Sequence, residues 1–183
     1  MIEQQTVMTE NDMVRRCQAG DREAFRAVVE KYQNILYGTA YLMTGNRTTA
    51  EDHVQEAFLA AWKNISSFRT GYPLKPWLVR ILVNKVISYQ RANANTMISL
   101  DTNLAADPAG DDPAEEIARR DQLKRVMQCL SNEQRQVVLL RYFAGLSVAE
   151  TAAALGRRQG TIKSQTYRAL EQLKDLIEDD NRQ

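Results

Sequence analysis

Hydrophobic residues recur every three or four positions through most of the chain, which is the period of an amphipathic α-helix. The pattern predicts helices over about 11–19, 21–41, 48–65, 77–91, 114–130 and 131–143, with two more between 148 and 177. No stretch of the sequence alternates hydrophobic and polar residues as a half-buried strand does. The chain is therefore predicted to be all-α.

Capping and breaking residues indicate where several of these helices start and stop. Asp21 is suited to cap the second helix, and Gly45-Asn46 is expected to end it. Thr48 or Thr49 is expected to start the third. Three helix-breaking residues predict a loop over Phe68–Pro76: Gly71, Pro73 and Pro76. Two capping boxes mark later starts: Ser131 with Gln134, and Ser147 with Glu150.

The stretch Leu146–Leu173 combines a short helix, a glycine turn at Gly156 and a longer helix. This order predicts a helix-turn-helix, whose second helix usually enters the DNA major groove. Polar and basic residues suited to bases and phosphates gather on the outer side: Arg157, Thr161, Lys163, Ser164, Tyr167 and Arg168. Such a corner also occurs in proteins that bind no DNA. The six basic residues and single acid between Arg135 and Arg168 favour DNA binding.

Charge is distributed unevenly along the 183 residues, although the net charge is only +1. Residues 57–100 carry six basic side chains and no acidic one, whereas residues 101–116 carry six acidic side chains and no basic one. This segregation predicts two small helical domains, over 1–92 and 114–183, joined by a flexible acidic linker over 93–113. On composition alone, the linker could be a plain tether.

Composition also excludes some classes of protein. Two cysteines, Cys17 and Cys129, and the single histidine, His53, have no spacing that would hold zinc, so no metal or cofactor is expected. Both cysteines are expected to be small apolar residues in a reducing cytoplasm. No hydrophobic run is long enough to span a membrane, and the first ten residues lack a signal-peptide core. A cytoplasmic protein without membrane insertion is expected.

Four segments in order resemble the bacterial sigma-70 family, and specifically its short extracytoplasmic-function (ECF) sigma factors. They are residues 50–62, 68–84, 130–142 and 160–164, which together span nearly the whole chain. The resemblance implies a protein that is not an enzyme. It would bind core RNA polymerase, direct it to the −35 and −10 promoter elements, and help to open the duplex.

The resemblance also implies roles for particular residues. Four would face the polymerase clamp helices: Glu51, Asp52, Gln55 and Glu56. Their acids would equally suit a helix start, where the dipole is positive. The loop Thr70–Pro76 would capture a base flipped from the non-template strand. The −10 contacts would be Tyr72, Lys75, Arg80, Asn84 and Lys85. The −35 contacts would be Arg141, Thr161, Lys163, Ser164, Tyr167 and Arg168.

The implied partners are the clamp and flap surfaces of core RNA polymerase, promoter DNA, and an anti-sigma factor that holds the protein inactive. Three features depart from the family pattern. Gln165 stands where members usually carry Arg, Ser88–Arg91 lacks the usual Asp and paired Arg, and Pro73 with Pro76 is unusual in the loop. The alternative is a stand-alone dimeric helix-turn-helix regulator, which would bind a two-fold operator without polymerase.

Overall fold

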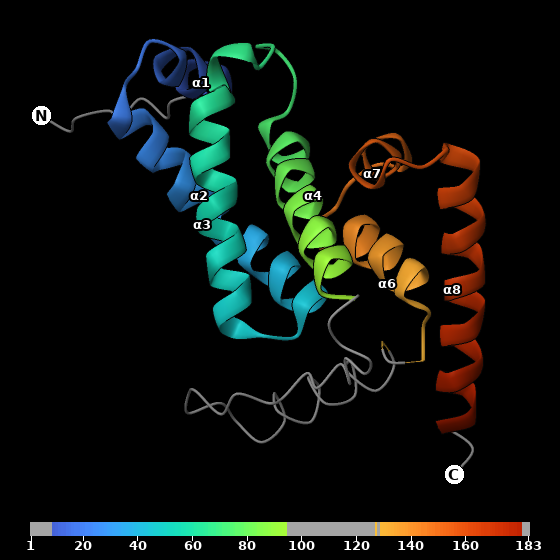
Figure 1. Ribbon diagram of the computed structural model, residues 1–183. Helices are drawn as coiled ribbons and strands as arrows, with labels where there is room; N and C mark the ends of the chain where they lie inside the picture. The colour runs from blue at the N-terminus through green and yellow to red at the C-terminus, as the bar shows by residue number, and fades with distance from the viewer. Residues whose placement is uncertain (1–8, 95–126, 128, 181–183) are drawn as a thin grey trace, which may run out of the picture.

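A computed structural model describes residues 9–94, 127 and 129–180. Figure 1 shows helices throughout, and the described residues contain no strand, which confirms the all-α prediction. The first domain contains α1 (Glu10–Gln18), α2 (Arg22–Thr44), α3 (Arg47–Asn64), the short 3-10 helix η1 (Ile65–Ser67) and α4 (Leu74–Ala94). The second contains α6 (Asn132–Val138), η2 (Leu139–Phe143), α7 (Val148–Leu155) and α8 (Gln159–Asp180).

Most of the predicted helix ends are confirmed by their hydrogen bonds. Asp21 Oδ1 accepts from the N–H groups of Glu23 and Ala24, at 2.9 and 3.1 Å. Both predicted capping boxes are formed, at the starts of α6 and α7. Gly45 ends α2 in the left-handed region, with φ of 68°.

One predicted start is wrong, because α3 begins at Arg47 rather than at Thr48 or Thr49. Asn46 caps it and accepts the N–H of Thr49 at 2.9 Å. Asparagine is as good an N-cap as serine or threonine. Asn46, which was predicted only to help end the second helix, therefore also starts the third. The first turn of α3 consequently holds no acid.

The loop before α4 is shorter than predicted, because α4 begins at Leu74. Pro76 therefore lies in the first turn of a helix instead of blocking one. A backbone N–H in the first turn has no partner within the helix, so proline loses nothing there. The loop itself is reduced to residues 68–73.

The core of the first domain lies between α1, α2, α3 and α4. Val28, Leu36 and Leu82 are fully buried, and Leu78 is 1% exposed. Trp77 is half-buried and packs against Phe68, with ring centroids 5.0 Å apart. Cys17 is buried in this core as predicted.

The predicted linker is described only at its start. The helix α4 continues to Ala94, two residues into the segment predicted as linker. The rest of that linker, the boundary at 113–114 and most of the helix predicted over 114–130 lie outside the described residues. Met127 and Leu130, at the end of that helix, are buried as a hydrophobic pattern requires. Cys129 between them is exposed, contrary to prediction, because it lies in a turn.

The second domain contains one element that the sequence did not predict. Residues Leu139–Phe143 form a π-helix, in which the N–H of Ala144 bonds to the carbonyl of Leu139, five residues back, at 2.9 Å. The wider turn moves the following side chains around the axis. The helical period of the sequence predicts that Tyr142 and Phe143 pack inward, but they are 57% and 44% exposed. Leu139 and Leu140 take the buried positions.

The two domains pack against each other, and the buried residues of both form one continuous hydrophobic core. In Figure 1, α7 lies beside α4 and α8 stands on the side away from α1–α3. The ring of Phe143 presses on α2 at Gly38, where an added Cβ would come within 2.5 Å of Cζ. Lys75 Nζ lies beside Gly145, 3.2 Å from the position of a Cβ there. None of the described helices is both long and apolar enough to cross a membrane.

Candidate nucleic-acid interface

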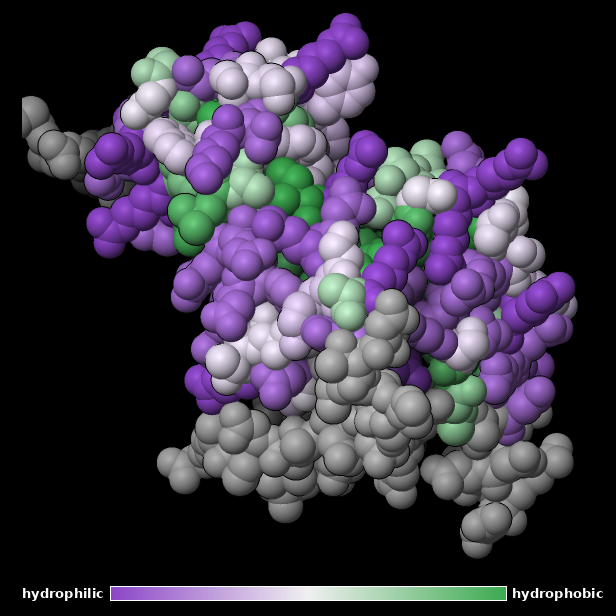
Figure 2. Space-filling model, viewed as in Figure 1, coloured by the Kyte–Doolittle hydropathy of each residue, from purple (hydrophilic) through white to green (hydrophobic). Residues whose placement is uncertain are grey.

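The helix α8 has one side buried against the domain and one side exposed to solvent. Ile162 and Ala169 are fully buried against the rest of the second domain. Five of the residues predicted to contact the −35 element are exposed on the other side: Thr161, Lys163, Ser164, Tyr167 and Arg168. Figure 2 shows that the surface over α8 is largely hydrophilic. The fold thus brings these five polar side chains together on one accessible helical face.

Arg141, the sixth predicted residue, has a different setting. It is half-buried in η2, and its Nη1 donates a hydrogen bond to the carbonyl oxygen of Leu146. Its Nε is buried and has no hydrogen-bond partner among the described residues. Arg141 therefore secures the turn that leads into α7, and it is separate from the exposed face of α8.

A polar network ties the beginning of α8 to α6. Arg157, which the sequence groups with the outer face, lies in the turn before α8 and donates from Nη1 to Gln165 Oε1 at 3.1 Å. Gln165 Nε2 donates to Glu133 Oε2 at 2.8 Å, and Glu133 also faces the guanidinium of Arg157 at 3.5 Å. These three side chains link the turn, α8 and α6.

A second set of predicted residues lies on the loop 68–73 and on α4. Tyr72 is 57% exposed on the loop, and the guanidinium of Arg69 stands over its ring, 5.4 Å from the centroid. Arg80 and Asn84 are exposed four residues apart on α4. Lys75 is in the first turn of α4 and faces the second domain at Gly145. The loop and α4 therefore present aromatic, amide and basic groups side by side.

The four predicted polymerase-facing residues are all exposed on α3: Glu51, Asp52, Gln55 and Glu56. Glu51 pairs with Arg47 one turn earlier, at 3.0 Å. Glu56 pairs with Lys85 of α4 at 3.0 Å, and this bond lowers the pKa of the Glu56 carboxyl. Lys85 was predicted to contact DNA, so the acidic face of α3 and the basic face of α4 meet at this ion pair.

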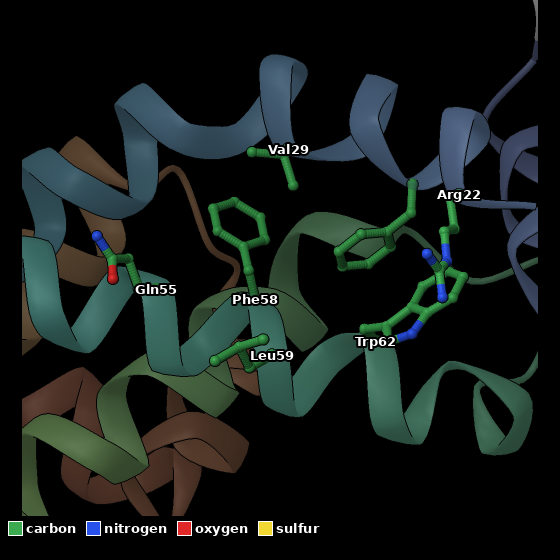
Figure 3. A pocket seen from close by; sticks show the side chains of 7 residues that line it. Arg22, Val29, Gln55, Phe58, Leu59 and Trp62 are labelled. Carbon is green, nitrogen blue, oxygen red and sulfur yellow. The ribbon is translucent and has the colours of Figure 1, made fainter.

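A hydrophobic groove beside the acidic face was not predicted. It lies between α2 and α3, has a volume of about 510 Å³, and is lined by Arg22, Phe25, Val29, Gln55, Phe58, Leu59 and Trp62 (Figure 3). Leu59 is 61% exposed on its edge. Figure 2 shows hydrophobic side chains reaching the surface over this part of the molecule. Leu59 next to the buried Phe58 widens the hydrophobic stripe beyond one packing face, which was the available signal in the sequence.

Comparisons with known proteins agree with this arrangement. The family model "Sigma-70 region 2" matches residues 28–96, and "Sigma-70, region 4" matches residues 120–173. The ECF RNA polymerase sigma factor BldN of Streptomyces coelicolor is 34% identical over 177 residues, 93% of this chain and 67% of that protein. The ECF RNA polymerase sigma-E factor of Haemophilus influenzae is 30% identical, over 93% of this chain and 96% of that protein.

The chain belongs to the sigma-70 family. Its relatives place it among the ECF RNA polymerase sigma factors, and SigW of Bacillus subtilis, 29% identical over 91% of this chain and 95% of that protein, is a further one. A sigma factor of this group is a transcription initiation factor.

Solved structures share this fold. The sigma factor RpoE of Bartonella quintana, in complex with the anti-sigma factor NepR, matches with a TM-score of 0.69 and 28% identity over 84% of this chain and 96% of that chain. CnrH, in complex with the cytosolic domain of CnrY, matches with a TM-score of 0.70 and 23% identity over 93% of this chain and 98% of that chain, and this likeness concerns the fold alone.

Within the sigma factor, the departure at Gln165 now has a structural setting. Its side chain is half-buried and is bonded to both Arg157 and Glu133. A longer, charged arginine at this position would place a second guanidinium beside that of Arg157. The glutamine thus supports the turn through its hydrogen bonds to both charged neighbours.

Proposed function

We propose that this ECF sigma factor binds promoter DNA and core RNA polymerase through three separate surfaces. The outer face of α8 reads the −35 element, the loop 68–73 with α4 captures and reads the −10 element, and α3 with its groove binds core RNA polymerase. One observation carries the proposal. The chain presents an exposed, polar helix-turn-helix face together with a separate exposed acidic helix, so it has surfaces for both DNA and a protein.

Recognition by α8 fits the chemistry of the major groove. Lys163 and Arg168 can pair with guanine or neutralise phosphate, and Ser164 can reach either base edges or backbone. All three are exposed on a helix whose other side is fixed by Ile162. A rigid support matters, because base contacts need the helix at a defined depth and angle in the groove. Arg141 would act on the same surface indirectly, by holding the turn before α7.

Opening of the −10 element requires a site that holds an unpaired base. Such a base is held by stacking on an aromatic ring and by cations near its phosphate. Tyr72 offers an exposed ring with Arg69 close by. Arg80 and Asn84 continue along α4. Lys85 is paired with Glu56, and Lys75 lies beside Gly145 of the second domain, so both would reach DNA once these surroundings change.

Binding of polymerase by α3 would combine charge with hydrophobic contact. The exposed acids of α3 suit a basic partner surface, and the adjacent hydrophobic groove could bind the apolar face of a helix of the partner. A protein with this role works where the polymerase is, in the cytoplasm.

The two domains must separate for both promoter elements to be held at once. In the structure, Phe143 packs on Gly38 and Lys75 faces the second domain. We infer that this packed arrangement belongs to the polymerase-free protein and that polymerase sets the distance between the two DNA-reading surfaces. An anti-sigma factor is the expected antagonist, as NepR is the anti-sigma factor in the complex of the related RpoE.

Gel filtration with purified core polymerase tests the proposal. The chain should co-elute with core, and Lys163→Ala with Arg168→Ala should retain co-elution while losing promoter-dependent run-off transcription. A matched control is Lys174→Ala, which removes an exposed lysine from the same helix about two turns beyond Tyr167, past the proposed reading residues. Failure to co-elute, or a dimer that binds DNA sites tightly without polymerase, would contradict the proposal.

A further inference from the structure

The helix α1 holds the loop 68–73 by side-chain hydrogen bonds to the loop's backbone. Gln18 Nε2 donates to the carbonyl oxygens of Ile65 and Phe68, at 3.0 and 2.7 Å. Asn11 Oδ1 accepts the N–H of Gly71 at 3.0 Å. Both side chains lie on one face of α1, seven residues and therefore two turns apart. They fix the entrance and the middle of the loop.

Glu10 fixes the exit of the loop. Its Oε1 accepts the N–H of Leu74, the first residue of α4, at 2.6 Å. Its other oxygen, Oε2, accepts from the hydroxyl of Tyr32 and from Lys31 Nζ, the latter at 3.0 Å. The carboxylate is thus anchored on α2 while it caps α4. A carboxylate at a helix N-terminus also meets the positive end of the helix dipole.

These bonds hold the loop's backbone and leave its side chains open. The backbone of Gly71 has φ of 92°, a conformation that favours glycine, and its N–H points to Asn11 rather than to solvent. Tyr72, the next residue, is 57% exposed. A loop ordered before it meets its ligand avoids the entropy cost of ordering during binding. The loop is therefore preorganised for binding, and the bonds that order it come from α1.

We propose that Glu10, Asn11 and Gln18 are positioning residues for base capture, and that α1 holds the loop 68–73 in the shape that receives the flipped −10 base. This inference rests on the proposed role of the loop at the −10 element. It assigns to α1 a part in strand opening that acts through the loop and requires no contact between α1 and DNA. Loosening α1's hold should therefore impair opening of a duplex promoter without weakening polymerase binding.

The test compares holoenzymes assembled from core polymerase and full-length variants. Asn11→Ala with Gln18→Ala should lower the rate of open-complex formation on a duplex promoter by about tenfold, or ~1.4 kcal/mol, the scale expected for the lost loop bonds. Permanganate reactivity of unpaired thymines measures the rate. On a template whose −10 region is already unpaired, the variant should transcribe as well as the wild type. Asn11→Asp keeps an acceptor for Gly71 and should open the duplex faster than Asn11→Ala.

The control variant is Asn46→Ala, which removes the N-cap of α3 and none of the bonds between α1 and the loop. It should lower thermal stability while opening the duplex at the wild-type rate. Equal opening defects in Asn46→Ala and Asn11→Ala would overturn the inference, because the bonds of α1 would then matter only for stability. Normal opening by Asn11→Ala with Gln18→Ala would overturn it as well. If the wild type transcribes neither template, the proposed function fails instead.

Discussion

Gly38→Ala should stabilise the first domain and at the same time loosen its contact with the second. Gly38 lies inside α2, where replacing glycine by alanine favours the helix by about 1 kcal/mol. The new Cβ would come within 2.5 Å of Phe143 Cζ and 2.9 Å of Cε1, so the ring must swing away. Two effects of opposite direction therefore follow from one methyl group.

The size of the second effect follows from the burial of Phe143. The side chain is 44% exposed, so roughly half of the ~1.5–3 kcal/mol gained by burying a phenylalanine is available to lose. A loss of about 1 kcal/mol shifts the ratio of packed to separated domains by about fivefold. Part of the ring will keep other contacts, so this is an upper value.

Energy transfer between two dyes measures the domain separation. One dye can be placed on the exposed Cys129 and the other on a cysteine replacing the exposed Ser66, since Cys17 is buried and should react slowly. Gly38→Ala should lower the transfer efficiency and raise the melting temperature of the first domain. Gly160→Ala is the matched control, because a Cβ there meets nothing within 4 Å. Unchanged transfer in Gly38→Ala, with Gly160→Ala also unchanged, would refute the reasoning about Phe143.

Further predictions concern the recognition helix and the support of the loop. Lys163→Ala and Arg168→Ala should each reduce the slope of log affinity against log salt for holoenzyme on promoter DNA by about 0.9 if each contacts one phosphate; an unchanged slope assigns the residue to bases or to solvent. Ile162→Ala removes a fully buried side chain and should destabilise the second domain by about 2–5 kcal/mol in urea unfolding; a cost near zero would contradict the anchoring of α8. Burial acts to raise the pKa of Glu10, but the bonds from Leu74, Tyr32 and Lys31 outweigh it and hold the pKa below its ordinary value of 4.5. A lowered folded-state pKa gives stability that is present above pH 4.5 and lost as pH falls through the folded pKa. Glu10→Gln should therefore be less stable than wild type near neutral pH, and the difference should shrink toward acid in thermal melts; a constant difference would contradict the effect.

Features governed by neighbours along the chain were predictable from the sequence. The capping boxes at Ser131 and Ser147 and the left-handed Gly156 each depend on residues within one turn, and all three are found. The buried side of α8 at Ile162 and Ala169 follows from helical periodicity. The fold class and the exposure of the polar face of α8 could therefore be predicted.

The features that were missed are local departures from the regular α-helical period and contacts between distant parts of the chain. The π-helix at Leu139–Phe143 changes the helical period, so Tyr142 and Phe143 emerge although their spacing indicated burial. The role of Arg141 depends on the carbonyl of Leu146, which becomes available only after that turn is formed. The hold of α1 on the loop joins residues 60 and 64 positions apart, a pairing that no local pattern carries.

The residues predicted to contact the −10 element differ in exposure, since Tyr72, Arg80 and Asn84 are exposed but Lys75 and Lys85 are half-buried. Arg80 and Asn84 are exposed, as residues that contact DNA must be. Lys85, by contrast, is paired with Glu56 of α3. The sequence shows both charged residues but does not show that they form an ion pair. The pair forms because the hydrophobic core beneath α3 and α4 packs these two helices together.

Transcription of fragmented genomic DNA by core polymerase, with and without this protein, measures promoter selection itself. Mapping the RNA 5′ ends should reveal start sites that appear only when the protein is added. These sites should share two short upstream elements, and the changes Lys163→Ala and Arg168→Ala together should abolish dependence on the −35 element. If no new start sites appear, or if the protein selects the same DNA fragments without polymerase, the chain does not direct polymerase to promoters in the way proposed.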